Sequence, residues 1–305
     1  MLIDDIERYL ALRRSLGFKL EQVAEYLQSF ACFAAARGEH HIRAQTAIEW
    51  AQTAPTAGAR YNRLRDVVRA ARFLHLEDPA HEIPPPGFFV RSRNKFIPYI
   101  FTPDDLLRIL NAAVELHRHQ YYAVQRQRYA MLFGLIAATG LRITEALDLR
   151  LGDILPGGIL HIRETKFGKS RLVPLHPTVR EALDRYLGLR RDFVGLVDCL
   201  FLSARGRRLS YAVVNKAFRE IVRHADIAPG RARQPRIHDL RHTFATRVLE
   251  QCGAGREAIA RHAVALMTYM GHTDLRYTYW YLQATPELMI DIAAAAEALV
   301  VGEVR

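Results

Sequence analysis

The sequence predicts a mainly α-helical protein of two domains, with one small β-hairpin in the second domain. Three observations predict this fold. Apolar residues recur at helical spacing through most of the chain, a proline-rich segment interrupts that pattern near residue 85, and two short β-type runs enclose a glycine at residue 168. With 305 residues, the chain is long enough to bury two separate cores.

The first domain is expected to span residues 1–84 and to consist of helices. Apolar residues recur there every three or four positions and form one stripe along a helix, at Leu20, Val23, Leu27, Phe30 and Ala34. A single apolar stripe is typical of helices that pack around a common core.

A helix expected over about 58–76 combines an apolar face with a basic one. The apolar face runs from Leu64 to Leu74, and the other face carries Arg65, Arg69 and Arg72. Such a row of arginines can be an ordinary solvated surface or a surface that contacts phosphates. In a basic chain we favour DNA contact as the sharper interpretation.

Residues 85–101 are expected to form a basic, proline-rich linker. The run Pro84 to Pro86 cannot continue a helix, because each proline lacks an amide donor and has a fixed φ. Arg91, Arg93 and Lys95 follow within five residues. An extended basic segment is suited to follow a phosphate backbone, although a solvated linker has the same composition.

The second domain is expected to span residues 102–305. Thr102 as N-cap, Pro103 at the first helical position and two acids in the first turn predict a helix start. Helices are expected to about residue 148. The runs 159–163 and 171–175 then predict a β-hairpin with Gly168 in its turn, and the rest of the chain returns to helices.

The overall charge and the cysteine pattern limit the class of protein. A formal net charge of +11 predicts an anionic partner, most often nucleic acid. The three cysteines are far apart and show no metal-ligand or disulfide spacing. No secretory leader and no apolar run of about 20 residues is present, so we expect a cytoplasmic protein that does not bind membranes.

Four separated segments carry residues suited to phosphodiester chemistry. In the first segment Arg142 follows Thr-Gly-Leu, and in the second His238 and Arg241 lie three positions apart. The third contains His272 in Gly-His-Thr-Asp, followed by tyrosines at 277, 279 and 281. The fourth is the hairpin turn, which contains Lys166. Guanidinium groups can hold the non-bridging oxygens of a phosphate, a phenol can attack it, and a lysine can protonate the leaving oxygen.

The sequence shows no carboxylate cluster that would bind a metal ion. The positive charge needed for phosphoryl transfer must then come from the side chains themselves. We therefore expect neither a metal ion nor another cofactor.

Together these segments resemble the catalytic signature of the tyrosine recombinases, also called phage integrases. The resemblance covers about residues 102–290, in the family's order and with closely matching motifs. It implies a site-specific DNA recombinase of a mobile element, phage or plasmid that acts on double-stranded DNA through a 3′-phosphotyrosine. It also implies that the helical first domain is the core-binding domain and that the second is the mixed α/β catalytic domain.

The resemblance further implies a role for each matched position. Arg142 and Arg241 would grip the scissile phosphate. His238 and His272 would bind its oxygens, and His238 would also transfer a proton. Lys166 would protonate the leaving 5′ oxygen, and Tyr281 would be the nucleophile. Glu145 would orient the surroundings of Arg142.

Three points stay open at this stage. Lys169 competes with Lys166 as the hairpin lysine, and Tyr277 shares a helical face with Tyr281. The segment 242–271 is longer than is usual in the family, which leaves every catalytic position in place but predicts an extended helix and loop.

The resemblance also implies assembly into a synaptic tetramer. Thr285-Pro-Glu predicts a C-terminal helix over about 286–300, whose apolar stripe includes Met289, Ile292, Ala296 and Leu299. This helix would dock on a neighbouring protomer, although the same stripe could pack within its own chain.

Two other functions are compatible with the same residues. One is a nicking and closing activity like that of type IB topoisomerases, and the other is a DNA-binding regulator without catalysis. The target sequence, any accessory proteins, and the choice among integration, excision, resolution, inversion and transposition do not follow from the sequence.

Overall fold

The chain divides into two compact units, residues 1–96 and 97–305, and each has its own hydrophobic core. The computed structural model describes residues 1–18, 20–90, 97–163, 170–193, 197–231, 233–251 and 256–271, with the backbone alone for 256–260. The division between the units falls inside the expected linker.

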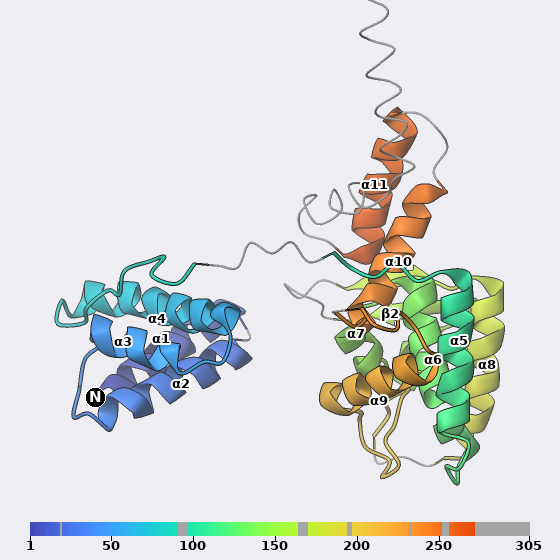
Figure 1. The fold of residues 1–305 in the computed structure, drawn as a ribbon, viewed down its shortest axis with the longest axis horizontal. Coiled ribbons are helices and arrows are strands. Elements are labelled where there is room, and N and C mark those ends of the chain that lie inside the picture. Colours follow the sequence, from blue (N-terminus) through green and yellow to red (C-terminus); the bar gives the residue numbers. More distant parts are fainter. Residues whose placement is uncertain are drawn as a thin grey trace, which may run out of the picture. The chain divides into compact units, whose positions relative to one another are not determined.

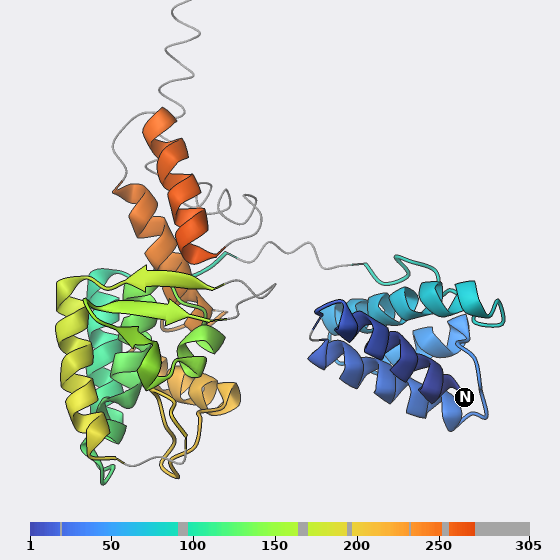
Figure 2. The same cartoon turned by 180° about the vertical axis from the view of Figure 1, so that it is seen from behind.

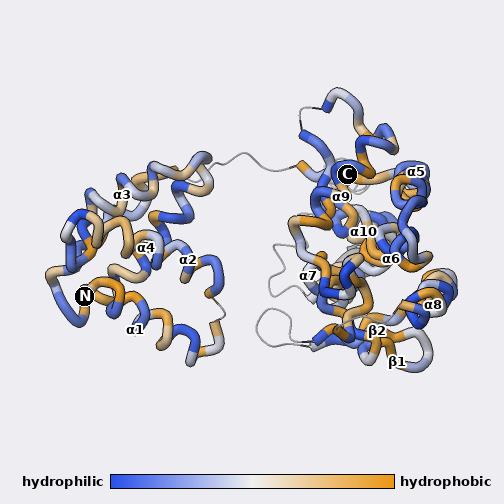
Figure 3. Tube along the Cα trace, turned by 90° about the horizontal axis from the view of Figure 1, so that it is seen from below, coloured by the Kyte–Doolittle hydropathy of each residue, from blue (hydrophilic) through white to orange (hydrophobic). Residues whose placement is uncertain are grey.

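The first unit consists of α1 (Leu2–Ser15), α2 (Glu21–Ala35), α3 (Ala44–Gln52) and α4 (Ala57–Glu77) (Figure 1). The apolar stripes expected on α2 and α4 are confirmed, because Leu27 and Phe30 of α2 and Leu64 and Leu74 of α4 are buried. Apolar and polar positions alternate along the helices of both units in the hydropathy view (Figure 3), as amphipathic helices require.

The second unit is mainly helical. Within the described residues its helices are α5 (Pro103–Leu116), α6 (Ala123–Thr139), α7 (Ile143–Asp148), α8 (Pro177–Arg191), α9 (Tyr211–His224), α10 (Ile237–Glu250) and α11 (Arg256–Met270). Thr102 and Asp105 form the capping box of α5, which confirms the predicted helix start.

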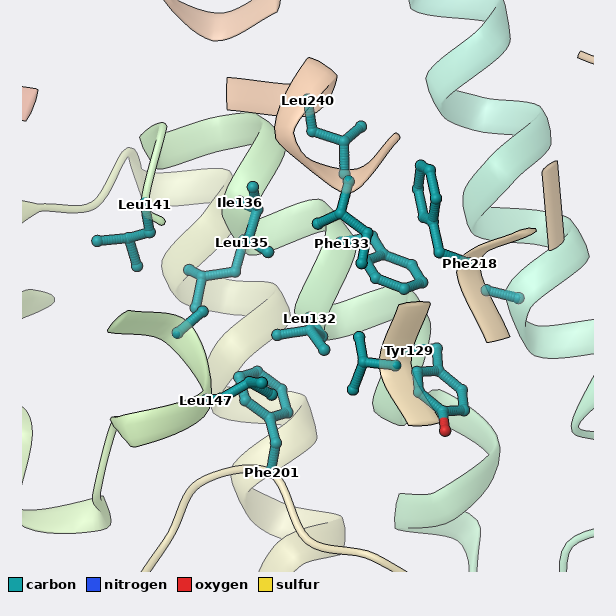
Figure 4. Packing of buried hydrophobic residues seen from close by; sticks show 14 of the residues in the cluster. Tyr129, Leu132, Phe133, Leu135, Ile136, Leu141, Leu147, Phe201, Phe218 and Leu240 are labelled. Atoms are coloured by element: carbon teal, nitrogen blue, oxygen red, sulfur yellow. The ribbon is translucent and has the colours of Figure 1, made fainter. Parts of the chain in front are cut away.

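Helix α6 lies in the centre of this unit and is buried on most of its surface. Leu132, Phe133 and Ile136 lie in one cluster with Phe218 of α9 and Leu240 of α10 (Figure 4). Packing on several sides explains why the sequence of α6 shows no clear polar face. The last turn of α6 therefore has a fixed position next to α10.

A three-stranded antiparallel sheet follows α7 (Figure 2). It consists of β1 (Ile154–Leu155), β2 (Ile159–Ile162) and β3 (Arg171–Pro174), in the order β1-β2-β3. Leu160 pairs with Val173 and Ile162 with Arg171. The two strands of the expected hairpin are thus confirmed. The turn between them, 164–169, lies outside the described residues. The additional strand β1 was not predicted.

Helix α10 anchors the start of the second unit. The Phe101 amide donates to the Thr243 hydroxyl over 2.9 Å, and Arg247 donates to the Phe101 carbonyl over 2.7 Å. Beyond this point α10 and α11 run side by side away from the body of the unit (Figure 1) and share a small cluster that includes Leu249, Leu266 and Met270. These two helices make up most of the long 242–271 segment.

Candidate active site

The first site residue, Arg142, lies just after the C-terminal end of α6. Gly140 ends that helix with a φ of +63°, a conformation that favours glycine. A Cβ at this position would also lie 2.5 Å from a ring carbon of Phe244 on α10. The chain can therefore turn here, close to α10, only because residue 140 has no side chain. Arg142 then becomes the N-cap of α7.

Glu145 binds both the backbone and the side chain of Arg142. Its carboxylate accepts the Arg142 amide over 2.9 Å and an Arg142 guanidinium nitrogen over 2.7 Å. It also accepts two parallel hydrogen bonds from Arg171 of β3, over 3.0 and 2.7 Å. Burial alone would raise the pKa of Glu145, but the hydrogen bonds and charge of Arg171, with those of Arg142, hold its pKa at about 2.

Arg241 of α10 is the most deeply buried arginine of the site, with a relative exposure of 1 %. Its guanidinium donates to the carbonyl of Gly140 and, over 2.9 Å, to the carbonyl of Met270. These carbonyls lie at the C-terminal ends of α6 and α11, where backbone oxygens lack helical partners and carry partial negative charge. Two helix ends therefore stabilise the buried charge of Arg241.

The end of α11 also brings the two arginines together. Arg142 donates to the Gly271 carbonyl over 3.1 Å, and Arg241 donates to the preceding carbonyl, that of Met270. The two guanidinium groups thus bind neighbouring peptide units. The same two units lead directly into His272, so the chain enters that position held by both arginines.

His238 lies one turn before Arg241 on α10 and reaches the surface. Desolvation by the surrounding protein, together with the positive charges of Arg241, Arg236 and Arg142, lowers its pKa to about 4. Its ring stands at right angles to that of His242, with 4.6 Å between the ring centroids. The imidazole is therefore neutral near pH 7, and a neutral imidazole can accept a proton.

Sequence reasoning missed Arg171 as a site residue. It begins β3, on the same face of the strand as the buried Val173, so its side chain points inward. A Cβ added to Gly271 would lie 3.2 Å from its Nη1 atom. The sequence did contain a signal for this residue, because Arg171 stands at an inward-facing position of a strand in which apolar residues are expected.

Several predicted site residues lie outside the described residues. They are Lys166, its rival Lys169, His272, the tyrosines 277, 279 and 281, the linker residues Arg91, Arg93 and Lys95, and the C-terminal segment 286–300. In the described parts of the chain, no three His, Cys, Asp or Glu side chains come together as a possible metal site. Within these described parts, no helix has both the length and the apolar character needed to cross a membrane.

The three α4 arginines expected to contact DNA are held less firmly than Arg142 and Arg241. Arg65 donates two hydrogen bonds to the buried Asp66, over 2.9 and 3.1 Å. Arg69 lies 3.6 Å from the same carboxylate with 63 % of its side chain exposed, and Arg72 is exposed. This face of α4 therefore presents two solvated guanidinium groups and a third that is largely bound to its neighbour.

An apolar cavity of about 840 Å³ lies in the second unit between α5, α6 and α8. Small side chains form much of its α6 wall, namely Ala130, Gly134, Ala137 and Ala138. Val179 and Ala182 of α8 also line it. A cavity with such walls can accept a helix that itself carries small apolar side chains.

Comparison with known proteins gives the family of this chain. The Phage integrase family profile matches residues 100–287. The chain is 36% identical over 292 residues to the integrase/recombinase y4rB of Sinorhizobium fredii, covering 93% of both chains. It is 30% identical over 226 residues to tyrosine recombinase XerD of Mycobacterium leprae, covering 72% of this chain and 66% of that protein.

Solved structures support the same fold. The Tn1549 transposon integrase in complex with transposon right end DNA has a TM-score of 0.63 at 17% identity, over 92% of this chain and 94% of that one. XerH recombinase bound to difH substrate in a pre-cleavage complex has a TM-score of 0.60 at 22% identity, over 91% and 81%. On its motifs, its fold and these relatives, the chain belongs to the phage integrase family of tyrosine recombinases.

Proposed function

We propose that this protein is a site-specific recombinase that cuts and rejoins double-stranded DNA through a 3′-phosphotyrosine at Tyr281. One observation carries the proposal: Arg142 and Arg241 donate to the neighbouring carbonyls of Gly271 and Met270. This arrangement binds two guanidinium groups to the two residues that precede His272. Two guanidinium groups held in this way can bind the non-bridging oxygens of a phosphate.

The proposed reaction has two balanced steps. In the first, the Tyr281 oxygen attacks the scissile phosphorus and the bond from phosphorus to the 5′ oxygen breaks. The phenolic proton passes to His238, which is neutral because its pKa is about 4, and Lys166 delivers a proton to the leaving oxygen. In the second step, a free 5′ hydroxyl from the partner duplex gives its proton to Lys166 and attacks the phosphotyrosine, the bond from phosphorus to the Tyr281 oxygen breaks, and that oxygen takes its proton back from His238.

The remaining site residues would stabilise the charge that develops on the phosphate. Arg142 and Arg241 would hold its non-bridging oxygens, and His272 would donate a further hydrogen bond. All the positive charge in this scheme comes from side chains. We therefore propose that the reaction needs no metal ion, and cleavage should persist in excess EDTA.

Outside the site, we propose that basic side chains hold the duplex through its phosphates. On α4 these are Arg69 and Arg72, with a smaller contribution from Arg65 because Asp66 binds it. In the linker they are Arg91, Arg93 and Lys95. Contacts of this kind position the protein on DNA without reading its sequence.

We also propose that the C-terminal helix docks on a neighbouring protomer of a tetramer. The segment 291–299 is rich in alanine, and the mainly apolar cavity between α5, α6 and α8 has small alanine and glycine side chains on much of its α6 wall, which suits such a helix. Truncation after Gln283 should impair the pairing of two sites more than binding to one site. Equal pairing by truncated and full-length protein would contradict docking in trans.

The proposed function needs a substrate before it can be tested. A core site can be selected from a random duplex library by repeated binding to the full-length protein. A copy of that site with a nick next to the cleavage position, here called the trapping duplex, loses a short fragment on cleavage and so retains the covalent adduct.

The experiment then combines two marked duplexes that carry the selected site. The proposed function predicts both a covalent adduct on the trapping duplex and recombinant products that join the two markers. Relaxation of supercoiled plasmid without joining would indicate a nicking and closing enzyme. Binding without any adduct would indicate a DNA-binding protein that does not catalyse.

A further inference from the structure

Arg171 contacts two parts of the candidate site, Glu145 and Gly271, although it is not among the residues that would touch DNA. It begins β3 and lies five positions after Lys166. It donates two hydrogen bonds to Glu145, which in turn accepts two from Arg142. Its guanidinium also packs against Gly271, the residue before His272.

The geometry of Glu145 makes it a shared acceptor. Its Oε1 atom accepts from Arg142 over 2.7 Å and from Arg171 over 3.0 Å, and its Oε2 atom accepts the Arg142 amide over 2.9 Å and Arg171 over 2.7 Å. Four donors saturate a carboxylate, which has about four lone-pair sites. Both arginines are therefore fixed relative to one rigid group at the start of α7.

The charges in this cluster explain why a second arginine is needed. The side chain of Glu145 is 7 % exposed and that of Arg171 is 12 % exposed, so both are shielded from water. A buried carboxylate beside Arg142 alone would cancel the charge that a phosphate requires. With Arg171 present, two positive groups share one negative group, and the cluster keeps one positive charge beside the surface where Arg142 is 30 % exposed.

We propose that Arg171 is a positioning residue of the strand-transfer site, which neutralises and fixes Glu145 so that Arg142 keeps its charge and its orientation for the scissile phosphate. This inference rests on the proposed function, since it assumes that Arg142 holds that phosphate. It also gives the hairpin strand that follows Lys166 a fixed connection to the end of α11, because Arg171 packs on Gly271.

The first test measures covalent-adduct formation by Arg171→Gln on the trapping duplex under single-turnover conditions. The rate should fall by about 10–100-fold, the usual loss when a supporting partner of an active group is removed. The dissociation constant for the same duplex should stay unchanged, because Arg171 faces the protein interior. Arg171→Gln at the wild-type rate would overturn the inference.

A second variant separates charge compensation from a merely structural role. If Arg171 acts by neutralising Glu145, then Glu145→Gln added to Arg171→Gln removes the uncompensated carboxylate and should recover much of the lost rate. A residue that only stabilises the hairpin predicts no recovery. A double variant as slow as Arg171→Gln, or slower, would therefore contradict the proposal.

The hairpin offers a matched control. Arg163 follows β2 on the other arm and pairs with Asp153, another buried carboxylate, but none of its described contacts reaches Arg142 or Gly271. Arg163→Gln should change the rate by no more than about twofold, as expected away from the site. A loss equal to that of Arg171→Gln would assign the effect to the hairpin as a whole and overturn the inference.

Folding and the underlying function are checked separately. Thermal unfolding shows whether Arg171→Gln folds. If it does not, Arg171→Lys replaces it, and its rate should fall by about tenfold because an ammonium cannot bind Glu145 through two planar donors. A wild-type rate for Arg171→Lys would then overturn the inference. If the wild-type protein itself forms no adduct, the proposed function fails instead.

Discussion

The arginines of α4 and those of the candidate active site carry the same charge in opposite settings. On α4, Arg69 and Arg72 are exposed, and the described ion pair of Arg69, with Asp66, spans 3.6 Å. In the second unit, Arg241 is 1 % exposed and bound to two helix ends, while Arg142 is bound to Glu145 and Gly271. The α4 arginines can therefore contribute positive charge, whereas Arg142 and Arg241 also hold their guanidinium groups in fixed orientations.

The two groups should therefore respond differently to substitution by lysine. A lysine keeps the charge but loses the planar pair of donors, so it should replace an α4 arginine and fail in the active site.

The largest expected effect is at Arg142 and Arg241 of the candidate active site. Arg142→Lys and Arg241→Lys should each lower the rate of adduct formation by about 10²–10³-fold, the usual cost of losing a donor to the transition state. Single-turnover cleavage of the trapping duplex measures this. Arg72→Lys is the control and should cleave at the wild-type rate. Near-normal cleavage by Arg142→Lys or Arg241→Lys would mean that these residues supply only background charge.

A smaller effect is expected from the turn that places Arg142. Gly157→Ala, at a φ of +84° with open space around it, should cost about 1–2 kcal/mol of folding free energy. Gly140→Ala has a similar φ but places its Cβ 2.5 Å from Phe244, so it should cost about 1–3 kcal/mol more. Urea unfolding of both variants measures the difference, and equal losses would exclude the close contact with α10.

The third prediction concerns pH and His238. Its pKa in the folded protein is about 4, below the ordinary value of 6.5, so between these values the unfolded chain binds a proton that the folded protein does not. This group therefore lowers the free energy of unfolding as the pH falls through that window, and contributes no change above it. His238→Gln removes the effect and should gain stability relative to wild type as the pH falls.

Thermal unfolding of both proteins between about pH 7 and about pH 4 measures this difference, and the subtraction removes the titration of carboxylates common to both. A difference that stays constant over the range would show that His238 does not keep a lowered pKa.

The smallest effect is expected on α4. Arg72→Ala should weaken the binding of specific and non-specific duplexes about equally and reduce the slope of log affinity against log salt by about 1. Binding titrations at several salt concentrations measure this slope. Arg72→Lys should keep it. Loss of binding to the selected site alone would contradict a role limited to phosphates.

The same contrast explains what could be predicted from the sequence. Local patterns were sufficient for the buried faces of α2 and α4, the capping box at Thr102 and the paired strands of the hairpin, since each depends on neighbours close in sequence. The short β1 strand escaped prediction because two residues carry no periodic signal.

The site was predictable in its residue types but not in its contacts. Motifs predicted Arg142, His238 and Arg241 as candidate site residues, yet nothing local indicates that Arg241 would be buried between the ends of α6 and α11. The bond between Arg171 and Glu145 also joins positions 26 residues apart and depends on the register of β2 with β3. Such contacts arise from tertiary packing, which spacing alone does not describe.

The central claim is that DNA becomes joined to Tyr281. Peptide mapping of the protein trapped on the nicked duplex tests it most directly, because protease digestion leaves a nucleotide on the peptide that carried the bond. The expected result is a modified Tyr281, with no adduct formed by Tyr281→Phe although that variant still binds the duplex. A nucleotide on Tyr277 or Tyr279, or an adduct that survives in Tyr281→Phe, would contradict the claim.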